Sequence, residues 1–259
     1  MSPSHVTLLL IAGLGAGTVN AIAGGGSLIT FPALLAVGLP AKPANFTNSV
    51  AVSPGYLASV YGSRMDLGEL AERRGRRTLL ALFPTTVLGT VLGALLLRAT
   101  PAGTFEIIVP FLVLGAAGVL AFQDRLRAVV GHPATMSGTR RVVALHGLAG
   151  LGAVYGGYFG AALGVMLVAG LGLVLDETMA RISALKNVIS ALAGLVTVVA
   201  FTLFGQIDWA AVGVLAPTTL LGGYLGARLA RRLPSRVLRA IIVGFGLVVG
   251  AYLLIKVLV

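Results

Sequence analysis

Long apolar runs without charge constrain this chain more than any other feature. Residues 81–97, ALFPTTVLGTVLGALLL, contain no charged side chain, and further long apolar runs follow along the chain. A helix needs about 20 mainly apolar residues to cross the hydrocarbon core of a bilayer. Only 10 % of the 259 residues are charged, whereas a soluble domain carries about 25 %. The sequence therefore predicts an all-α, polytopic integral membrane protein whose surroundings are the lipid bilayer.

The apolar runs divide into helical segments of two kinds. Three segments, 28–37, 142–155 and 161–175, are short for a full crossing. Together with 6–22 they form two pairs, and a glycine-rich break interrupts each pair, AGGGS in the first and YGGYFG in the second. The short segments could be full spans or re-entrant hairpins. The remaining predicted segments are 45–61, which is slightly polar, 79–97, 105–122, 182–204, 210–230 and 238–257.

The basic residues of the chain are confined to particular connections. Arginines gather in 62–78, 123–141 and 228–239, and the connections between these stretches are poor in cations. A topology signal therefore explains the net charge of +11 better than a nucleic-acid-binding surface does. Under the positive-inside rule the three stretches lie in the cytoplasm, and both termini lie outside. The N-terminus lacks a basic region, so we expect a first membrane segment there rather than a cleaved signal peptide.

The sequence offers no metal or cofactor site. It has no cysteine, and its three histidines are too scattered for a metal-ligand spacing. The acidic residues fall in loops or at segment ends, with Glu106 near the outer end of its segment. A proton relay of carboxylates at mid-membrane is therefore not predicted, and a cation pathway is disfavoured. No nucleophile–base pair stands out either, so we do not expect an enzyme.

The two halves of the chain repeat one another. The phrase PTT at 84–86 returns at 217–219, a shift of 133 residues, and the residues around it match as well. Upstream the shift is 139 residues and pairs Asn48 with Asn187, because the connection between these regions is longer in the first half. This pattern predicts an internal duplication. Its parts are a first membrane repeat at 1–127, a basic cytoplasmic linker at 128–141 and a second membrane repeat at 142–259.

Equivalent connections in the two halves carry opposite charge bias. The arginine-rich stretch 62–78 corresponds to 205–209, which has no cation, and the arginine-poor connection 98–104 corresponds to 228–239. Each half also contains an odd number of segments, about five. We therefore predict two inverted repeats that include short, glycine-broken hairpin segments. Inverted repeats are typical of secondary transporters, which bind substrate between the halves.

The glycine-rich breaks are the first candidates for substrate binding. Broken helices survive in a membrane only where protein or a cavity satisfies the freed backbone groups. The amides of the first break, together with a helix N-terminus at Ser27, form a candidate anion site, and the second break has the same role by the repeat. Close helix packing is the competing interpretation, above all for the second break, where glycines are spaced by four. The candidates are Gly24, Gly25, Gly26, Ser27, Gly156, Gly157, Tyr158, Gly160 and Gly164.

Polar residues at the start of the third segment of each half are the second group of candidates. Asn45, Thr47 and Asn48 lie within one turn, and Lys186 and Asn187 occupy the positions equivalent to the last two. An ionisable residue inside a membrane segment suggests a functional site. Lys186 lies about a turn from the predicted cytoplasmic end, so its side chain could instead reach the membrane surface. Amides, asparagines, hydroxyls and a lysine favour an anion as the bound species.

Several of these stretches resemble one known family. AGTVNAIAGGGSLITFPALLAVGLPAKPANFTNSVA resembles the opening motif of the sulfite exporter TauE/SafE family of bacterial membrane permeases. YGGYFGAALGVMLVAGLGLVL and SALKNVISALAGLVTVVAFTLFGQIDW resemble its second-half motif, although Ala161-Ala162 stands where another glycine is expected. The resemblance adds Asn20 and Pro32 to the characteristic positions and implies a polytopic inner-membrane permease for small anions such as sulfite, sulfonates or related organic acids.

The expected function is transport of a small anion by alternating access between two inverted halves. The resemblance suggests export, although the residues themselves give no direction. A channel-like facilitator and an uptake permease are alternatives within transport. A membrane-embedded enzyme and a scaffold subunit are alternatives from other classes, and the scaffold would not explain polar residues duplicated at equivalent depths. The sequence leaves open whether the protein forms a homo-oligomer.

Overall fold

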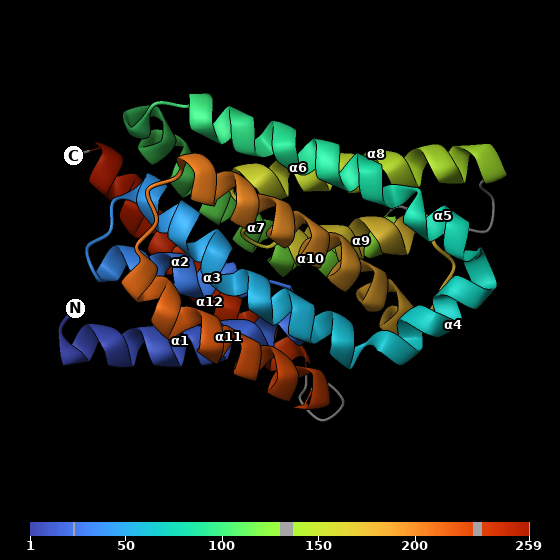
Figure 1. Cartoon of the computed structure of the whole chain (residues 1–259), viewed down its shortest axis with the longest axis horizontal. Helices are drawn as coiled ribbons and strands as arrows, with labels where there is room; N and C mark the ends of the chain where they lie inside the picture. The colour runs from blue at the N-terminus through green and yellow to red at the C-terminus, as the bar shows by residue number, and fades with distance from the viewer. Residues whose placement is uncertain (23, 130–136, 230–234, 259) are drawn as a thin grey trace.

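The part of the chain that the structure describes is helical throughout. The computed structural model describes residues 1–22, 24–129, 137–229 and 235–258, and no strand occurs among them. The helices are α1 (Pro3–Ile22), α2 (Ser27–Ala36), α3 (Ala41–Gly62), α4 (Arg64–Arg74), α5 (Arg76–Leu80), α6 (Leu82–Ala99), α7 (Ala102–Val129), α8 (Gly138–Tyr158), α9 (Leu163–Val174), α10 (Met179–Phe204), α11 (Trp209–Leu229) and α12 (Ser235–Leu258) (Figure 1).

Several helices are long and apolar enough to cross a bilayer. Within the described residues, five stretches meet this criterion by length and composition. Their outward faces carry large exposed apolar side chains, such as Leu88, Phe111 and Val199, which a lipid environment accommodates. These findings confirm the predicted all-α, multi-pass membrane protein. The five stretches are Pro3–Ala21, Arg76–Ala99, Ala102–Val119, Met179–Phe204 and Trp209–Gly226.

Two segments differ from the sequence-based expectation. The basic stretch 62–78, expected to be a loop, is mostly helical and forms α4 and α5. Asp66 in the first turn of α4 and arginines in its last turn match the helix dipole, and Gly75, with φ of +84°, ends the helix. The segment expected at 142–155 is also longer, since α8 has 21 residues. Ser137 caps α8 by accepting a hydrogen bond from the Arg140 amide, so the helix begins in polar sequence before the apolar run.

The two short helices fold back along their predecessors. A Cβ added to Gly26 would lie 2.2 Å from the Ala16 carbonyl oxygen, and one added to Gly15 would lie 4.0 Å from Ile29, so α2 runs antiparallel to α1. The second pair repeats this arrangement, because Gly156 of α8 approaches Leu163 of α9. At 1.5 Å per residue, the 10 residues of α2 span only about 15 Å, half of a bilayer core. Both pairs are therefore helical hairpins whose second arm is half-length.

The contacts between helices follow the order of the repeat. α1 packs along α11 and α8 packs along α6, while α3 crosses α10 and α7 packs on α12. If each of the first five predicted segments is exchanged with its counterpart among the last five, the same set of helix contacts is obtained. Figure 1 shows α1 and α8 running in opposite directions, with α2 and α9 in opposite halves of the molecule.

The glycines that follow the repeated PTT motif lie at two of these equivalent contacts. A Cβ on Gly93 of α6 would fall 2.0 Å from the Val154 carbonyl oxygen of α8, and one on Gly226 of α11, its counterpart at the shift of 133 residues, would fall 2.6 Å from the Thr18 carbonyl oxygen of α1. Glycines four residues apart thus let the two backbones approach closely, as in small-xxx-small helix pairs. In each half, the glycines that follow the PTT motif thus provide the groove for the long arm of the other half's hairpin.

The connections collect at two ends of the molecule. α4, α5 and the start of α8 lie at one end, and both termini lie at the other (Figure 1). The arginine-rich stretch 62–78 and the arginines at the start of α8 therefore share one end. We call this the basic end.

A buried ion-pair network ties α4 to α10 at the basic end. The Glu177 side chain is 1 % exposed and accepts hydrogen bonds from Arg74 (2.7 Å) and Arg181 (3.2 Å), with Arg73 at 3.5 Å. Arg181 also binds Glu69 of α4 at 2.7 Å. Burial raises the pKa of the Glu177 carboxyl, but the hydrogen bonds and charges of the arginines outweigh burial and hold the pKa below its ordinary value of 4.5.

The first prediction concerns this carboxylate. Glu177→Gln is expected to lower the stability of the purified protein at neutral pH by about 1–3 kcal/mol, because it removes charge-assisted hydrogen bonds. Because the pKa of the Glu177 carboxyl is lower in the folded state than the unfolded-state value near 4.5, the ionised carboxylate stabilises the fold above about pH 4.5. This stabilisation is lost as the pH falls through the folded-state pKa. The thermal midpoints of the wild type and the variant should therefore converge as the pH drops below about 4.5. Glu72→Gln, on the exposed side of α4, is the matched control; equal midpoints for Glu177→Gln and the wild type at neutral pH would contradict the prediction.

Candidate functional site

The tips of the two hairpins meet in backbone contact. A Cβ added to Gly164 would lie 2.6 Å from the Gly24 Cα atom, and one added to Gly24 would lie equally close to the Gly164 Cα atom. Gly24 also has φ of +83° and Gly160 has φ of +73°, a conformation that glycine adopts without strain. The two glycine-rich breaks are therefore brought together, and side chains at Gly24 and Gly164 would force them apart.

Lys186 of α10 inserts beside this contact. Its side chain is 1 % exposed, and its Nζ donates a hydrogen bond to the Asn20 carbonyl oxygen at 3.0 Å. Asn20 in turn accepts a hydrogen bond from the Gly26 amide at 2.7 Å through Oδ1. Lys186 thus points into the protein instead of reaching the membrane surface. Among the described residues no carboxylate lies within ion-pair distance of its ammonium group.

Both short helices direct their N-terminal ends toward the same region. Neither α2 nor α9 has a side chain capping its N-terminus. In the turn before α9, the amides of Ala161, Ala162 and Gly164 donate to no acceptor in the described part of the chain. Ala162 has φ of +58° and ψ of +15°, so the turn bends without the glycine expected there. A helix N-terminus carries a partial positive charge of about half a unit, so two such ends and a lysine make this region electropositive.

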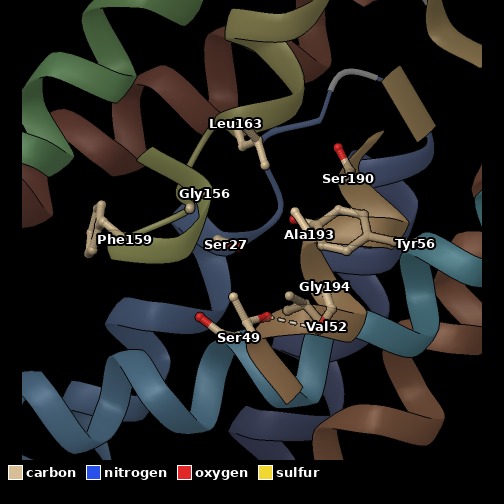
Figure 2. Close-up of a pocket in the computed structure, with 12 residues that line it drawn as sticks. Ser27, Ser49, Val52, Tyr56, Gly156, Phe159, Leu163, Ser190, Ala193 and Gly194 are labelled. Carbon is tan, nitrogen blue, oxygen red and sulfur yellow. Dashed lines mark hydrogen bonds between the residues drawn. The ribbon is translucent and has the colours of Figure 1, made fainter. Parts of the chain in front are cut away.

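A small cavity lies between the hairpin tips and the crossing of α3 and α10. Its volume is about 20 Å³, room for about one water molecule. Figure 2 shows Ser27 and Gly156 on the hairpin side, with Tyr56 and Ser190 on the other. The Ser190 hydroxyl is buried and has no hydrogen-bond partner in the described residues. Ser49, Gly160 and Thr197 complete the polar and glycine lining of the cavity.

Ser190 is a site residue that the sequence-based candidates omitted. It follows Lys186 by one turn, and Ala193, Gly194 and Thr197 continue the same stripe along α10. This spacing of small and hydroxyl residues at intervals of three and four was visible in the sequence. Ser49 and Tyr56 carry no comparable signal, because only the crossing of α3 with α10 and the hairpins brings them to the cavity.

The asparagines of the two halves do not meet one another. Asn48 accepts a hydrogen bond from Thr30 of α2, whereas Asn187 donates to the Ser59 carbonyl oxygen at 3.3 Å and to the Ser63 hydroxyl at 3.1 Å. Ser59 lies 11 residues beyond Asn48 on α3, about 16 Å along the helix axis. The two amides therefore act at different levels of the molecule, both in contacts between helices.

The other candidates at the start of α3 hold the two halves together. Asn45 donates to the Tyr158 carbonyl oxygen at 2.9 Å, and the Thr47 hydroxyl accepts from the Asp208 amide at 3.0 Å. The Tyr158 hydroxyl lies 3.3 Å from the Thr100 hydroxyl, away from Lys186.

Among the remaining glycines, a Cβ on Gly157 would fall 2.2 Å from the Thr90 carbonyl oxygen, so Gly157 serves packing of α8 on α6. Gly25 precedes α2 in the first break, and the Gly25 carbonyl accepts from the Leu28 amide. Of the sequence-based candidates, the geometry thus gathers Asn20, Gly24, Gly25, Gly26, Ser27, Gly156, Gly160, Gly164 and Lys186 around the hairpin tips.

The assembled site supplies hydrogen-bond donors and positive charge. The described residues contain no group of three metal-ligating side chains, and no cofactor is implied by the donor set. A lysine ammonium, unpaired amides and a serine hydroxyl without a partner can all donate to the oxygens of an anion. The arrangement can therefore bind and desolvate a small anion; it contains no nucleophile held by a base.

Comparison with known proteins agrees with this architecture. The family model described as "Sulfite exporter TauE/SafE" matches residues 9–253. The chain is 28 % identical to "Probable membrane transporter protein YfcA" of Escherichia coli K12, an alignment that covers 98 % of this chain and 91 % of the relative. It is 29 % identical to a "Probable membrane transporter protein" of Haemophilus influenzae, covering 92 % and 90 %. No solved structure matches the chain significantly.

The family match extends over nearly the whole chain, and it includes both hairpins and the α3–α10 crossing. The relatives are named as membrane transporters and not as enzymes. Together with its multi-pass helical fold, this match shows that the chain is a membrane transporter of the sulfite exporter TauE/SafE family.

Proposed function

We propose that the protein transports small oxyanions, such as sulfite, sulfonates or related organic acids, and binds them where the two hairpin tips meet Lys186. One observation carries this proposal: Lys186 is 1 % exposed and pairs with no carboxylate in the described residues. An unpaired charge in the interior costs several kcal/mol. A substrate anion supplies the missing counter-charge.

The groups around Lys186 favour an oxyanion over other small solutes. The Ser190 hydroxyl and the Asn20 side-chain amide lack partners among the described residues, and the turn before α9 presents further free amides. Each of these groups can donate a hydrogen bond, and they come from α1, from α10 and from the turn before α9. A sulfite or sulfonate group offers several acceptor oxygens around a compact charge, so one such group can satisfy several donors at once.

The transport mechanism follows from the two halves. We propose that they are inverted repeats and that transport proceeds by alternating access, with one half rocking against the other. The exchangeable helix contacts and the opposite directions of α1 and α8 support this proposal. A cavity of about 20 Å³ is too small for a sulfite ion, so the present conformation is closed, and the hairpin tips must separate to admit substrate.

The basic connections and the family description suggest how the protein is oriented in the membrane and in which direction it moves the anion. We place the basic end in the cytoplasm of a bacterial inner membrane, because positively charged connections are retained there, and both termini on the opposite side. The family description favours export of the anion. Uptake is the alternative direction, and a channel-like facilitator is the alternative mechanism.

Counterflow in proteoliposomes tests the proposed function. Vesicles containing the purified protein and unlabelled sulfite are diluted into labelled sulfite, and parallel samples contain a sulfonate or a carboxylic acid. An alternating-access transporter accumulates label transiently and carries no measurable single-channel current. Conductance without counterflow would establish a channel instead, and absence of protein-dependent movement for all three anion classes would refute anion transport.

The second prediction concerns the two asparagines. Asn48→Ala combined with Asn187→Ala is expected to destabilise the protein by about 0.5–1.5 kcal/mol per site, because each change removes hydrogen bonds between helices. We expect a lower thermal midpoint and a lower maximal flux, while the substrate concentration for half-maximal flux changes by less than about 2-fold. The two single variants serve as controls for additivity. A large rise in that concentration with unchanged stability would show that these amides bind the substrate.

A further inference from the structure

A large apolar groove lies on the outer surface of the helix bundle, away from the proposed anion site. Its volume is about 1100 Å³. The half-length helix α2 forms its floor through Ile29, Pro32 and Ala33, while α1 lies on one side and α7 and α12 lie on the other. The groove exists because α2 spans only about half the membrane thickness, so the longer helices around it leave a recess.

The groove is lined mainly by apolar side chains on the lipid-facing surface, so its expected occupant is a hydrocarbon chain. Most of the residues that line it are aliphatic, glycine or proline, and several of the side chains, including Ile11 and Ile107, are more than half exposed within the protein. α1 and α7 are long and apolar enough to cross a membrane, and α2 and α12 carry shorter apolar stretches, so the exposed side chains face lipid. Water in this groove would leave its apolar surface hydrated, which is unfavourable, whereas an acyl chain covers that surface.

One charged residue lines this groove at its outer end. Glu106 lies four residues after the start of α7, about 6 Å along the helix axis. That depth places its carboxylate near the headgroup layer, at the end of the molecule that carries the termini. The Glu106 side chain forms no ion pair or hydrogen bond with the described residues. A carboxylate beside an acyl-chain groove is complementary to a lipid whose headgroup carries an ammonium group.

We propose that this groove is a binding site for an aminophospholipid, with one acyl chain lying against α2 and the primary ammonium of the headgroup on Glu106. A primary ammonium has three N–H donors and forms charge-assisted hydrogen bonds to a carboxylate. The quaternary ammonium of a choline headgroup has no N–H donor, and the net negative charge of a glycerol headgroup is repelled. The site is therefore selective for phosphatidylethanolamine.

A lipid can bind in this groove whichever anion is transported. Its binding is coupled to transport through α2, because this helix forms the groove floor and also contributes Ser27 to the cavity lining. A lipid in the groove supports the outer face of α2, so its removal should loosen the first hairpin.

Native mass spectrometry of the full-length protein tests the site. The detergent-purified protein is stripped of lipid and offered dioleoyl phosphatidylethanolamine, phosphatidylcholine or phosphatidylglycerol in turn. We expect the wild type to retain phosphatidylethanolamine about tenfold better than phosphatidylcholine, and Glu106→Gln to lose this preference. Equal retention of the three lipids by the wild type would overturn the headgroup assignment.

A second variant tests the groove itself. Gly103 lines it, and a Cβ at this position would meet no atom within 4 Å, so Gly103→Leu places a side chain in the groove without disturbing the helix. Gly115→Leu on the same helix is the matched control, since a Cβ there is equally unobstructed and the residue does not line the groove. Gly103→Leu should reduce phosphatidylethanolamine retention at least about 5-fold and the control should not. Unchanged retention in Gly103→Leu would overturn the site, as would a stable dimer in which a second copy covers the groove.

Discussion

Lys186→Met is expected to lower anion flux at least about 100-fold, equivalent to a loss of about 3 kcal/mol of substrate interaction. Methionine keeps the length and apolar stem of lysine but carries no charge and no donor. The variant should fold, because replacing a buried charge by an apolar side chain of similar size is often neutral or stabilising. Proteoliposome counterflow measures the flux, and the thermal midpoint in detergent measures the fold.

Three comparisons separate a binding role for Lys186 from a structural role. Lys42→Met is the matched control, because Lys42 donates to the carbonyl oxygens of Arg98 and Thr100 at the end of α6 and lies outside the site. Lys186→Arg keeps the charge in a larger group and should retain partial flux with a changed preference among anions. In addition, substrate should raise the thermal midpoint of the wild type but not of Lys186→Met. Wild-type flux in a folded Lys186→Met protein would remove this residue from the mechanism and the proposal with it.

Gly164→Ala is expected to produce the second-largest effect. The added Cβ would lie 2.6 Å from the Gly24 Cα atom, 3.0 Å from the Gly24 carbonyl oxygen and 3.0 Å from Cδ of Lys186. Backbone atoms cannot move aside as a side-chain end can, so the hairpin tips must separate. Overpacking of this kind costs about 1–3 kcal/mol, and we expect a lower thermal midpoint together with the loss of most counterflow.

The control for this substitution uses another glycine of the second half. A Cβ on Gly147 of α8 would meet nothing within 4 Å, and alanine there should stabilise the helix by about 0.5–1 kcal/mol. Gly147→Ala should therefore transport like the wild type. If Gly164→Ala matched Gly147→Ala in both stability and flux, the contact between the hairpin tips would not be a feature of the working transporter.

The helices were largely predictable, and the basic stretch 62–78 shows where prediction failed. Apolar runs identify membrane segments because lipid imposes the same requirement on each helix separately. α4 has no such run. It is helical because Leu70 is buried under the second half of the molecule, because Glu69 binds Arg181 at the start of α10, and because two arginines at its end bind Glu177, two residues before α10. These contacts join residues more than 100 positions apart in the chain.

The candidate site was predictable in part. Lys186 and the glycine-rich breaks stood out because a charge or a broken helix in a membrane requires an explanation that the local sequence does not provide. Asn48 and Asn187 stood out for the same reason, yet the structure uses both amides between helices. Polarity in a membrane segment indicates that a partner exists, but it does not distinguish a neighbouring helix from a substrate.

The sequence by itself determined that the chain is a multi-pass helical membrane protein and that its helices break at two glycine-rich points, and it predicts that the two halves are related. These properties follow from composition, spacing and local backbone preference. Only the tertiary structure decided that the breaks touch through Gly24 and Gly164, that Lys186 points between them and that the Ser190 hydroxyl has no hydrogen-bond partner among the described residues. Burial and proximity depend on how α3, α10 and the hairpins pack together, and packing is a property of all the surfaces at once rather than of any one segment.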